Sequence, residues 1–123
     1  MWNCPYASDN FLSFTEDFRD KNASPSFKML SEVAHNKGIA IVGGSIPEQY
    51  GGRLYNTSCI FGIDGELLAE HRKVHLFDMN APGDISFKES DNFTSGDRPT
   101  VVDTGHEKTT VIAEVNYSMI PLR

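Results

Sequence analysis

The 123-residue sequence is poor in cysteine, poor in clustered basic residues and free of long apolar runs, and each shortage excludes a class of protein. Two cysteines, Cys4 and Cys59, are too few for a disulfide framework in a chain of this composition. Neither has a neighbour at metal-ligand spacing, and the four histidines are scattered along the chain. We therefore expect neither a metal site nor a bound cofactor.

The charge of the chain argues against binding to nucleic acid. Lys and Arg number 11 against 17 Asp and Glu, which gives a formal net charge of −6 and a pI near 5.1. The basic cluster at residues 71–75 is short, and the acidic Glu66, Glu70 and Asp78 flank it. Because binding to a phosphate backbone depends on clustered Lys and Arg, we expect no nucleic-acid partner.

The apolar runs of the sequence are short. No stretch approaches the ~18 apolar residues that a membrane-spanning helix needs. The first four residues lack the charged start and the apolar core of a signal peptide. We expect no membrane partner, and a soluble protein of the cytoplasm or the mitochondrion.

The composition is that of one ordinary domain, with 39% apolar and 23% charged residues. No repeat, low-complexity tract or linker divides the chain, so we expect a single domain over residues 1–123. Its first 21 residues are aromatic and polar without clear periodicity. They indicate either a surface loop held by its aromatic side chains or a loop that lines a substrate site.

The segment after residue 23 predicts a helix. Ser24 suits the N-cap, Pro25 the first helical position and Gly38 the end of a helix. Apolar residues recur at helical spacing between them, at Phe27, Leu30, Val33 and Ala34. We expect an amphipathic helix over Pro25–Lys37 that packs on a sheet.

Strand-like patterning follows the helix. Ile39–Ile46 opens with an apolar, β-branched run that predicts a strand buried on both faces. Gly43–Gly44 predicts a bulge or a close backbone approach, and Gln49–Gly52 an exposed turn.

Two further pairs of strands complete the pattern. Leu54–Phe61 and Leu67–Arg72 flank an Asp-Gly turn and predict a β-hairpin. Pro99–Asp103 and Thr109–Val115 are strand candidates around a turn at Thr104–His106. Helix, strand and hairpin together predict a layered α/β or α+β domain.

A cation and a carboxylate follow the hairpin. Lys73 falls at the C-terminal end of the strand Leu67–Arg72, and in α/β sheets that edge is where ligands bind. A loop with Gly and Pro then leads to Glu89. Taken alone, Lys73 is better explained as an exposed lysine at a strand end. For Glu89 the alternative to a site residue is a solvated carboxylate on a loop.

Four segments carry a resemblance to a known family. They are Met1–Tyr6 (MWNCPY), Ile41–Glu48 (IVGGSIPE), Leu54–Thr57 (LYNT) and Arg72–Ser90, which contains RKVHLFD and APGDISFKES. In this order and at these spacings they resemble the nitrilase superfamily of carbon-nitrogen hydrolases, and within it the omega-amidase branch.

The resemblance implies a fold as well as an activity. It runs over residues 1–110, whereas residues 111–123 diverge. It implies part of a nitrilase-type α-β-β-α sandwich in a single incomplete domain, because members of the family are much longer chains. Sheet faces and strand edges that the rest of such a fold covers should then be exposed.

The family uses a cysteine nucleophile, a glutamate base, a lysine beside the oxyanion and a second glutamate that positions the site. A thiolate can attack a poorly electrophilic amide carbonyl, and an ammonium stabilises the charge that develops in the transition state. The resemblance assigns the lysine to Lys73 and the second glutamate to Glu89 as catalytic residues. We expect the two side chains to approach each other at the mouth of a concavity near the start of the chain.

The other two residues of the family's site depart from this pattern. The base glutamate belongs ahead of the segment that matches Met1–Tyr6, and the cysteine belongs where Asn116 stands when Tyr117 anchors the comparison. Cys4 is a poor substitute because no base accompanies it, and Cys59 fits a small core residue.

Two functions are compatible with these features. The resemblance implies hydrolysis of the terminal amide of small 2-oxo dicarboxylate monoamides, such as 2-oxoglutaramate, through a thioester, by a protein that forms homodimers. The alternative is a catalytically inactive fragment or splice-like product that associates with a full-length homologue.

Overall fold

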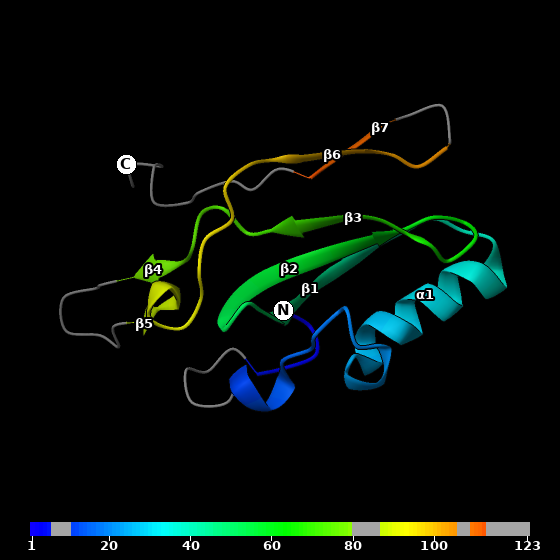
Figure 1. Cartoon of the computed structure of the whole chain (residues 1–123). Helices are drawn as coiled ribbons and strands as arrows, with labels where there is room; N and C mark the ends of the chain where they lie inside the picture. Colours follow the sequence, from blue (N-terminus) through cyan, green and yellow to red (C-terminus); the bar gives the residue numbers. More distant parts are fainter. Residues whose placement is uncertain (6–10, 80–86, 106–108, 113–123) are drawn as a thin grey trace.

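The computed structural model of the chain describes residues 1–5, 11–79, 87–105 and 109–112. Its centre is a three-stranded antiparallel sheet of β1 (Ile41–Tyr50), β2 (Arg53–Phe61) and β3 (Leu67–Arg72), in that order (Figure 1). The helix α1 (Pro25–Lys37) packs on one side of this sheet. The mixture of helix and sheet confirms the predicted α/β fold class.

Shorter elements surround this centre. Two small antiparallel pairs are β4 (Asp78–Met79) with β5 (Phe87–Lys88), and β6 (Thr100–Asp103) with β7 (Thr109–Ile112). Three 3-10 turns are η1 (Phe11–Phe14), η2 (Lys21–Ala23) and η3 (Glu89–Asp91). All strand pairings among the described residues are antiparallel, apart from an isolated bridge between Glu16 and Glu48. The ligand-binding edge expected of a parallel α/β sheet therefore does not apply to β3.

The helix α1 has the predicted bounds, but its N-terminus is capped differently from the expectation. Ser24 occupies the N-cap position, yet its hydroxyl donates to a backbone carbonyl of the preceding segment. The carboxylate of Glu16 instead accepts the N–H groups of Ser26 and Phe27 at 3.0 and 3.1 Å. Gly38, at a φ of 60°, ends the helix in the left-handed conformation.

The main apolar core lies between α1 and the sheet. Phe27 stacks on Phe18 with the ring centroids 5.3 Å apart and meets Phe61 edge-on at 4.9 Å. The other buried members are Ala34, Ile46 and Cys59, with Leu30 and Ile41 packed against them. Val33 was expected on this face but is 38% exposed, because the stripe of α1 that meets the sheet is narrower than the apolar pattern suggests.

β1 differs from its prediction in extent and in burial. It begins at Ile41 and continues to Tyr50, so the turn is confined to Gly51–Gly52 rather than Gln49–Gly52. Both glycines have a positive φ, which a two-residue hairpin turn of this kind requires. Val42 is 50% exposed, so the expected burial on both faces is wrong. The described residues provide one covering layer for this part of β1, not two.

The predicted bulge in β1 is confirmed. The pairing of β1 with β2 shifts in register between Val42 and Ser45. A Cβ atom on Gly43 would lie 2.6 Å from Leu30 Cδ1 and 3.2 Å from the Cys59 carbonyl oxygen, so the glycine lets the Leu30 side chain of α1 pack directly on the strand.

The β2–β3 hairpin is confirmed, and α1 holds its turn. Gly65 has a φ of 80°, and its N–H donates to the Gly62 carbonyl oxygen at 2.9 Å. The Ser31 hydroxyl donates to the Gly65 carbonyl oxygen at 2.6 Å, and His35 Nδ1 lies 3.0 Å from the Asp64 carbonyl oxygen. The turn is therefore tied to the helix as well as to its own strands.

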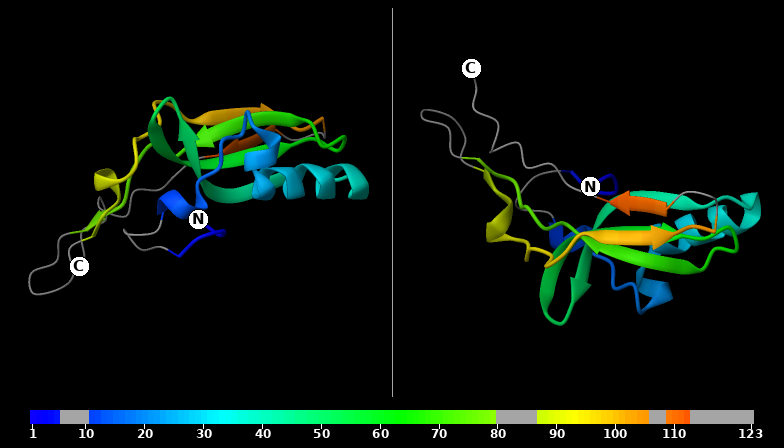
Figure 2. Two further views of the ribbon diagram at one scale, coloured as in Figure 1. Left: turned by 60° about the horizontal axis from the view of Figure 1, so that its bottom comes forward. Right: turned by 90° about the horizontal axis from the view of Figure 1, so that it is seen from above.

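The pair β6 and β7 lies beside β3, on the side of the molecule away from α1 (Figure 2). His71 Nδ1 is 3.1 Å from the hydroxyl oxygen of Thr100, which joins β3 to β6. Both strand candidates are confirmed here, although residues 113–115 of the second lie outside the described residues.

The first residues of the chain are anchored by aromatic side chains, as predicted. Phe11 and Phe18 are buried, and the Phe11 ring meets Phe93 edge-on at 4.8 Å. Trp2 is 47% exposed but donates its indole N–H to the Gly44 carbonyl oxygen at 3.1 Å. Whether this segment lines a substrate site stays a prediction.

Candidate active site

The backbone holds Lys73 directly after β3. Its N–H donates to the Asn56 carbonyl oxygen at 2.8 Å, which extends the β2–β3 pairing by one residue. Its carbonyl oxygen accepts the Gly96 N–H at 2.7 Å. Both backbone groups are thus fixed, and the side chain projects from a rigid strand end.

The Lys73 ammonium contacts Glu89, as predicted. Nζ lies 2.8 Å from Glu89 Oε2, across 16 positions in the sequence. The Lys73 side chain is 23% exposed, whereas the Glu89 side chain is fully buried. One of the three ammonium N–H groups is therefore committed to Glu89, and among the described side chains no second acceptor is recorded for the other two.

Glu89 accepts a hydrogen bond from three separate elements. Oε2 accepts the Lys73 ammonium and, at 2.6 Å, the Phe77 N–H, while Oε1 accepts the side-chain amide of Asn56 at 2.8 Å. The Glu89 N–H donates back to the Phe77 carbonyl oxygen at 3.0 Å, so the carboxylate and the backbone of the residue dock on the same segment.

These contacts decide the charge of Glu89. Burial alone raises the pKa of a carboxyl group, but the hydrogen bonds from Lys73, Asn56 and Phe77 outweigh it and hold the pKa of Glu89 below its usual value. Glu89 is therefore an ionised carboxylate whose two oxygens are already engaged. It can position Lys73, and it is poorly suited to accept a proton.

Close backbone packing behind Lys73 depends on Gly96. A Cβ atom at this position would lie 2.1 Å from the Arg72 carbonyl oxygen. The absence of a side chain lets the segment after η3 run directly against the end of β3, where its N–H reaches Lys73.

A second ion pair, which the sequence reasoning missed, lies next to Lys73. Arg72 donates to both oxygens of Glu48, at 2.6 and 2.8 Å, and its guanidinium stacks 3.9 Å from the centre of the Tyr55 ring. The Glu48 side chain is 4% exposed and also accepts the Thr57 hydroxyl at 2.7 Å. The hydrogen bond to Glu48 raises the pKa of Arg72. This network joins the three strands immediately before Lys73.

The signal for this network was present in the sequence. Glu48 and Arg72 both fall within the segments that carry the family resemblance, at strand positions where a charged residue is buried only when it is paired. Asn56 also falls within one of these segments, as a buried polar residue inside a strand, and such a residue needs a hydrogen-bond partner.

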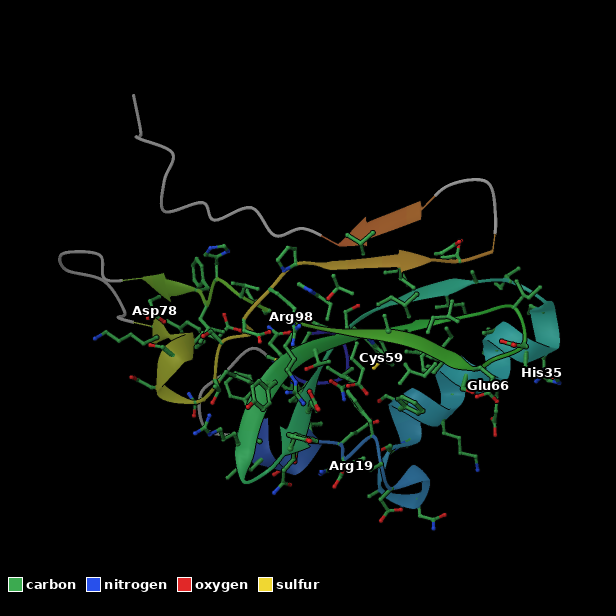
Figure 3. All side chains as sticks on the ribbon, turned by 45° about the horizontal axis from the view of Figure 1, so that its top comes forward. Arg19, His35, Cys59, Glu66, Asp78 and Arg98 are labelled. Atoms are coloured by element: carbon green, nitrogen blue, oxygen red, sulfur yellow. The ribbon has the colours of Figure 1, made fainter. Side chains whose placement is uncertain are left out.

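Neither described cysteine has the character of a thiolate nucleophile. Burial raises the pKa of the Cys59 thiol far above its usual value, and Cys59 lies in the core at the middle of the sheet (Figure 3). Burial also raises the pKa of the Cys4 thiol. The thiol form is favoured at both positions, which agrees with the expectation that Cys59 is a core residue. Asn116, at the expected nucleophile position, lies outside the described residues.

A hollow lies beside this site rather than over it. It has a volume of about 350 Å³ and is lined by Tyr50, Glu70, Arg72, Asp97, Arg98 and Thr100. Lys73 and Glu89 do not line it, so the hydrogen-bond geometry, not this hollow, defines the site. The concavity expected at Lys73 stays a prediction.

Among the described side chains, no three or more His, Cys, Asp or Glu residues gather as metal ligands. No described helix is both long enough and apolar enough to cross a bilayer.

Comparison with known proteins identifies the family. A family model described as carbon-nitrogen hydrolase matches residues 1–118. The chain belongs to the carbon-nitrogen hydrolase family. The resemblance read from the four sequence segments is thereby confirmed.

Relatives in this family include proteins named as omega-amidases. The chain is 55% identical over 105 residues to the chloroplastic omega-amidase of Arabidopsis thaliana, covering 85% of this chain and 28% of that protein. It is 45% identical over 107 residues to an omega-amidase of Mus musculus, covering 87% of this chain and 37% of that protein. The chain therefore spans about a third of the length of these relatives.

A solved structure of the family agrees with the fold. The crystal structure of Saccharomyces cerevisiae Nit3, a member of branch 10 of the nitrilase superfamily, matches with a TM-score of 0.67 at 38% identity. The match covers 84% of this chain and 35% of that one. The helix and sheet described above are thus part of a nitrilase-type fold.

Proposed function

We propose that this chain carries the lysine and the positioning glutamate of an amidase that hydrolyses the terminal amide of small 2-oxo dicarboxylate monoamides. The observation that carries the proposal is the 2.8 Å contact between Lys73 Nζ and the fully buried Glu89. An ammonium fixed in this way is aimed before substrate arrives, so it stabilises an oxyanion without reorganising. The relatives named as omega-amidases support the substrate class.

The roles of the two residues differ. Lys73 donates to the carbonyl oxygen of the amide as this oxygen becomes negatively charged. Glu89 keeps the ammonium charged and oriented, because both carboxylate oxygens already accept hydrogen bonds. Attack and proton transfer to the departing ammonia belong to a thiol and a base other than Glu89.

An activity assay on a chimeric protein tests this function. Residues 1–105 of this chain replace the segment they match in the Arabidopsis omega-amidase, and ammonia release from 2-oxoglutaramate is measured. We expect turnover, and we expect Lys73→Ala to lower kcat by about 10²–10³-fold, the usual effect of removing one oxyanion donor. Lys88→Ala is the matched control, since Lys88 is an exposed lysine next to the site. Full activity of the Lys73→Ala chimera would refute the role of Lys73.

A second candidate function rests on Asn116. An amide side chain cannot form a thioester, so a chain with Asn116 at the nucleophile position is catalytically inactive and acts, if at all, by associating with a full-length homologue. The family's homodimers supply the form of such an association. Size-exclusion chromatography of the chain with and without a full-length relative tests this association. Elution of the chain together with the relative would support it, and elution of the chain at the same volume in both runs would contradict it.

The compartment remains a prediction. We propose a cytoplasmic setting from the sequence, while the plant relative is named chloroplastic.

A further inference from the structure

Asn56 contacts both members of the candidate site, Lys73 and Glu89. It lies in the interior of β2 and is 4% exposed. Its side-chain Nδ2 donates to Glu89 Oε1 at 2.8 Å, across 33 positions in the sequence, and its backbone oxygen accepts the Lys73 N–H at 2.8 Å. One residue therefore fixes the carboxylate through its side chain and the lysine through its backbone.

A buried asparagine inside a strand lowers the stability of the fold unless its side-chain amide makes a favourable contact. Asparagine is disfavoured in strands, and a buried polar atom without a partner destabilises a fold. Asn56 Oδ1 is such an atom, because no described group donates to it. An apolar residue of similar size at this strand position would avoid both penalties.

The side-chain amide of Asn56 stabilises the ionised form of the Glu89 carboxylate. Among the described residues, the hydrogen bond from Asn56 is the one that reaches Oε1, while Lys73 and Phe77 both donate to Oε2. A flipped amide would place Oδ1 against the carboxylate and repel it. Only one orientation of Asn56 is therefore compatible with an ionised Glu89, and that orientation leaves Oε2 directed at the ammonium.

We propose that Asn56 is a positioning residue of the active site, whose side-chain amide orients the Glu89 carboxylate and whose carbonyl fixes the backbone of Lys73. The catalytic meaning of this role rests on the proposed amidase function. The role itself concerns only Asn56, Glu89 and Lys73, and it is measurable in the chain without turnover.

The test is an NMR titration of the isotopically labelled 123-residue chain. The Glu89 side-chain carboxyl carbon and the Asn56 side-chain N–H signals are followed as the pH is lowered. We expect both to change with the same midpoint, below the ordinary value of 4.5, because the amide donates to the charged form of Glu89.

Two substitutions sharpen the test. In Asn56→Ala, the loss of one donor to a charged acceptor should raise the Glu89 midpoint by about one unit or more. In the nearly isosteric Asn56→Asp, a second carboxylate faces Glu89, and the pair should show an apparent midpoint raised by more than about one unit. Asn22→Ala is the control, since Asn22 is exposed and does not contact Glu89.

A structural role alone gives a different result. If Asn56 only filled space, both variants would lose stability while the Glu89 midpoint stayed within about 0.3 units of the wild-type value, and the proposal would be wrong. If neither variant folds, the wild-type titration decides. Asn56 side-chain N–H signals that do not change at the Glu89 midpoint would also show that the proposal is wrong.

The chimera tests the catalytic meaning of this role. In it, Asn56→Asp should lower kcat and move the acid limb of the pH profile to higher pH, with little change in KM. A chimera without any turnover refutes the proposed function and leaves the titration result standing.

Discussion

The carboxylate of Glu89 is withdrawn from solvent, yet it stays ionised because N–H donors reach both of its oxygens. Burying a charged group costs several kcal/mol even after relaxation. Hydrogen bonds to a charged acceptor contribute about 1.5–3 kcal/mol each, so three of them contribute about 4.5–9 kcal/mol and offset this cost. The lowered pKa is consistent with that balance.

The residue scale gives a prediction on pH. Because the pKa of folded Glu89 lies below its ordinary value of 4.5, its contribution to stability is complete above that pH and is lost as the pH falls through the folded pKa. Glu89→Gln removes this titration, so the free energy of unfolding should fall less steeply below pH 4.5 than in the wild type. Urea unfolding at several pH values measures the slope.

The same substitution has an effect at neutral pH. Gln leaves the Lys73 ammonium without its carboxylate, which should destabilise the fold by about 3 kcal/mol. Glu66→Gln is the matched control, because Glu66 is exposed. Asp17 and Asp78 also have lowered pKa values, so the comparison is made as a difference from the wild-type slope. An unchanged acid slope in Glu89→Gln would contradict the ionised state of this group.

At the scale of elements, three segments that are distant in the sequence contribute the residues of the candidate site. β2 contains Asn56, Lys73 follows directly after β3, and η3 begins with Glu89. The chain after η3 then returns to the sheet, where Thr94 donates to the Leu54 carbonyl oxygen at 2.7 Å. The position of Lys73 therefore depends on a segment about 20 residues further along, whose hydrogen bonds secure both strand ends.

A substitution at Gly96 tests this dependence. A Cβ atom there would overlap the Arg72 carbonyl oxygen, so Gly96→Ala should push the returning segment away from β3 and break its hydrogen bond to Lys73. We expect a loss of stability of about 1–3 kcal/mol. In the chimera, a displacement of the Lys73 backbone by about 1 Å should lower kcat by about 10²-fold.

The control for this prediction is Ser95→Ala, which adds no bulk at the neighbouring exposed position. Thermal unfolding measures the stability, and amide hydrogen exchange of Gly96 measures the hydrogen bond. A Gly96→Ala protein with wild-type stability and an exchange-protected residue 96 would show that the end of β3 is not packed as described.

The elements with local signals were predictable. Pro25 and Gly38 set the bounds of α1, and the Asp64-Gly65 turn set the β2–β3 hairpin, because each signal acts within a few residues. The burial of Val42 was overestimated because an apolar pattern shows which face needs cover and not what covers it. The positions of Lys73 and Glu89 came from the family resemblance, since neither residue has a local signal.

The missed partners share a physical reason. Asn56 meets Glu89 across 33 positions, and Arg72 meets Glu48 across 24. Contacts of this range depend on the register of the whole sheet, which a one-residue slip would abolish. Sequence patterning fixed each strand separately and could not place these side chains opposite each other.

At the scale of the whole molecule, the site is divided along the chain. Lys73 and Glu89, the ion pair to which we assign the oxyanion site, lie within the described part of the chain. The position expected for the nucleophile falls on Asn116, outside the described residues but inside the family match to residue 118. The proposed amidase activity therefore requires that a thiol, and not the Asn116 amide, occupy the nucleophile's place.

A pair of chimeras of different length tests this point. The chimera with residues 1–105 keeps the relative's own residue at the nucleophile position, whereas a chimera with residues 1–118 brings in Asn116. We expect the longer chimera to lose turnover of 2-oxoglutaramate by a factor on the order of 10⁴–10⁶, because no acyl-enzyme can form and the members of a covalent catalytic unit act together. Asn116→Cys should restore measurable ammonia release, and Asn116→Ala, the matched control, should not. If the longer chimera turned over as fast as the shorter one and still lost activity on Lys73→Ala, Asn116 would not be at the reacting carbon, and the comparison anchored on Tyr117 would have to shift.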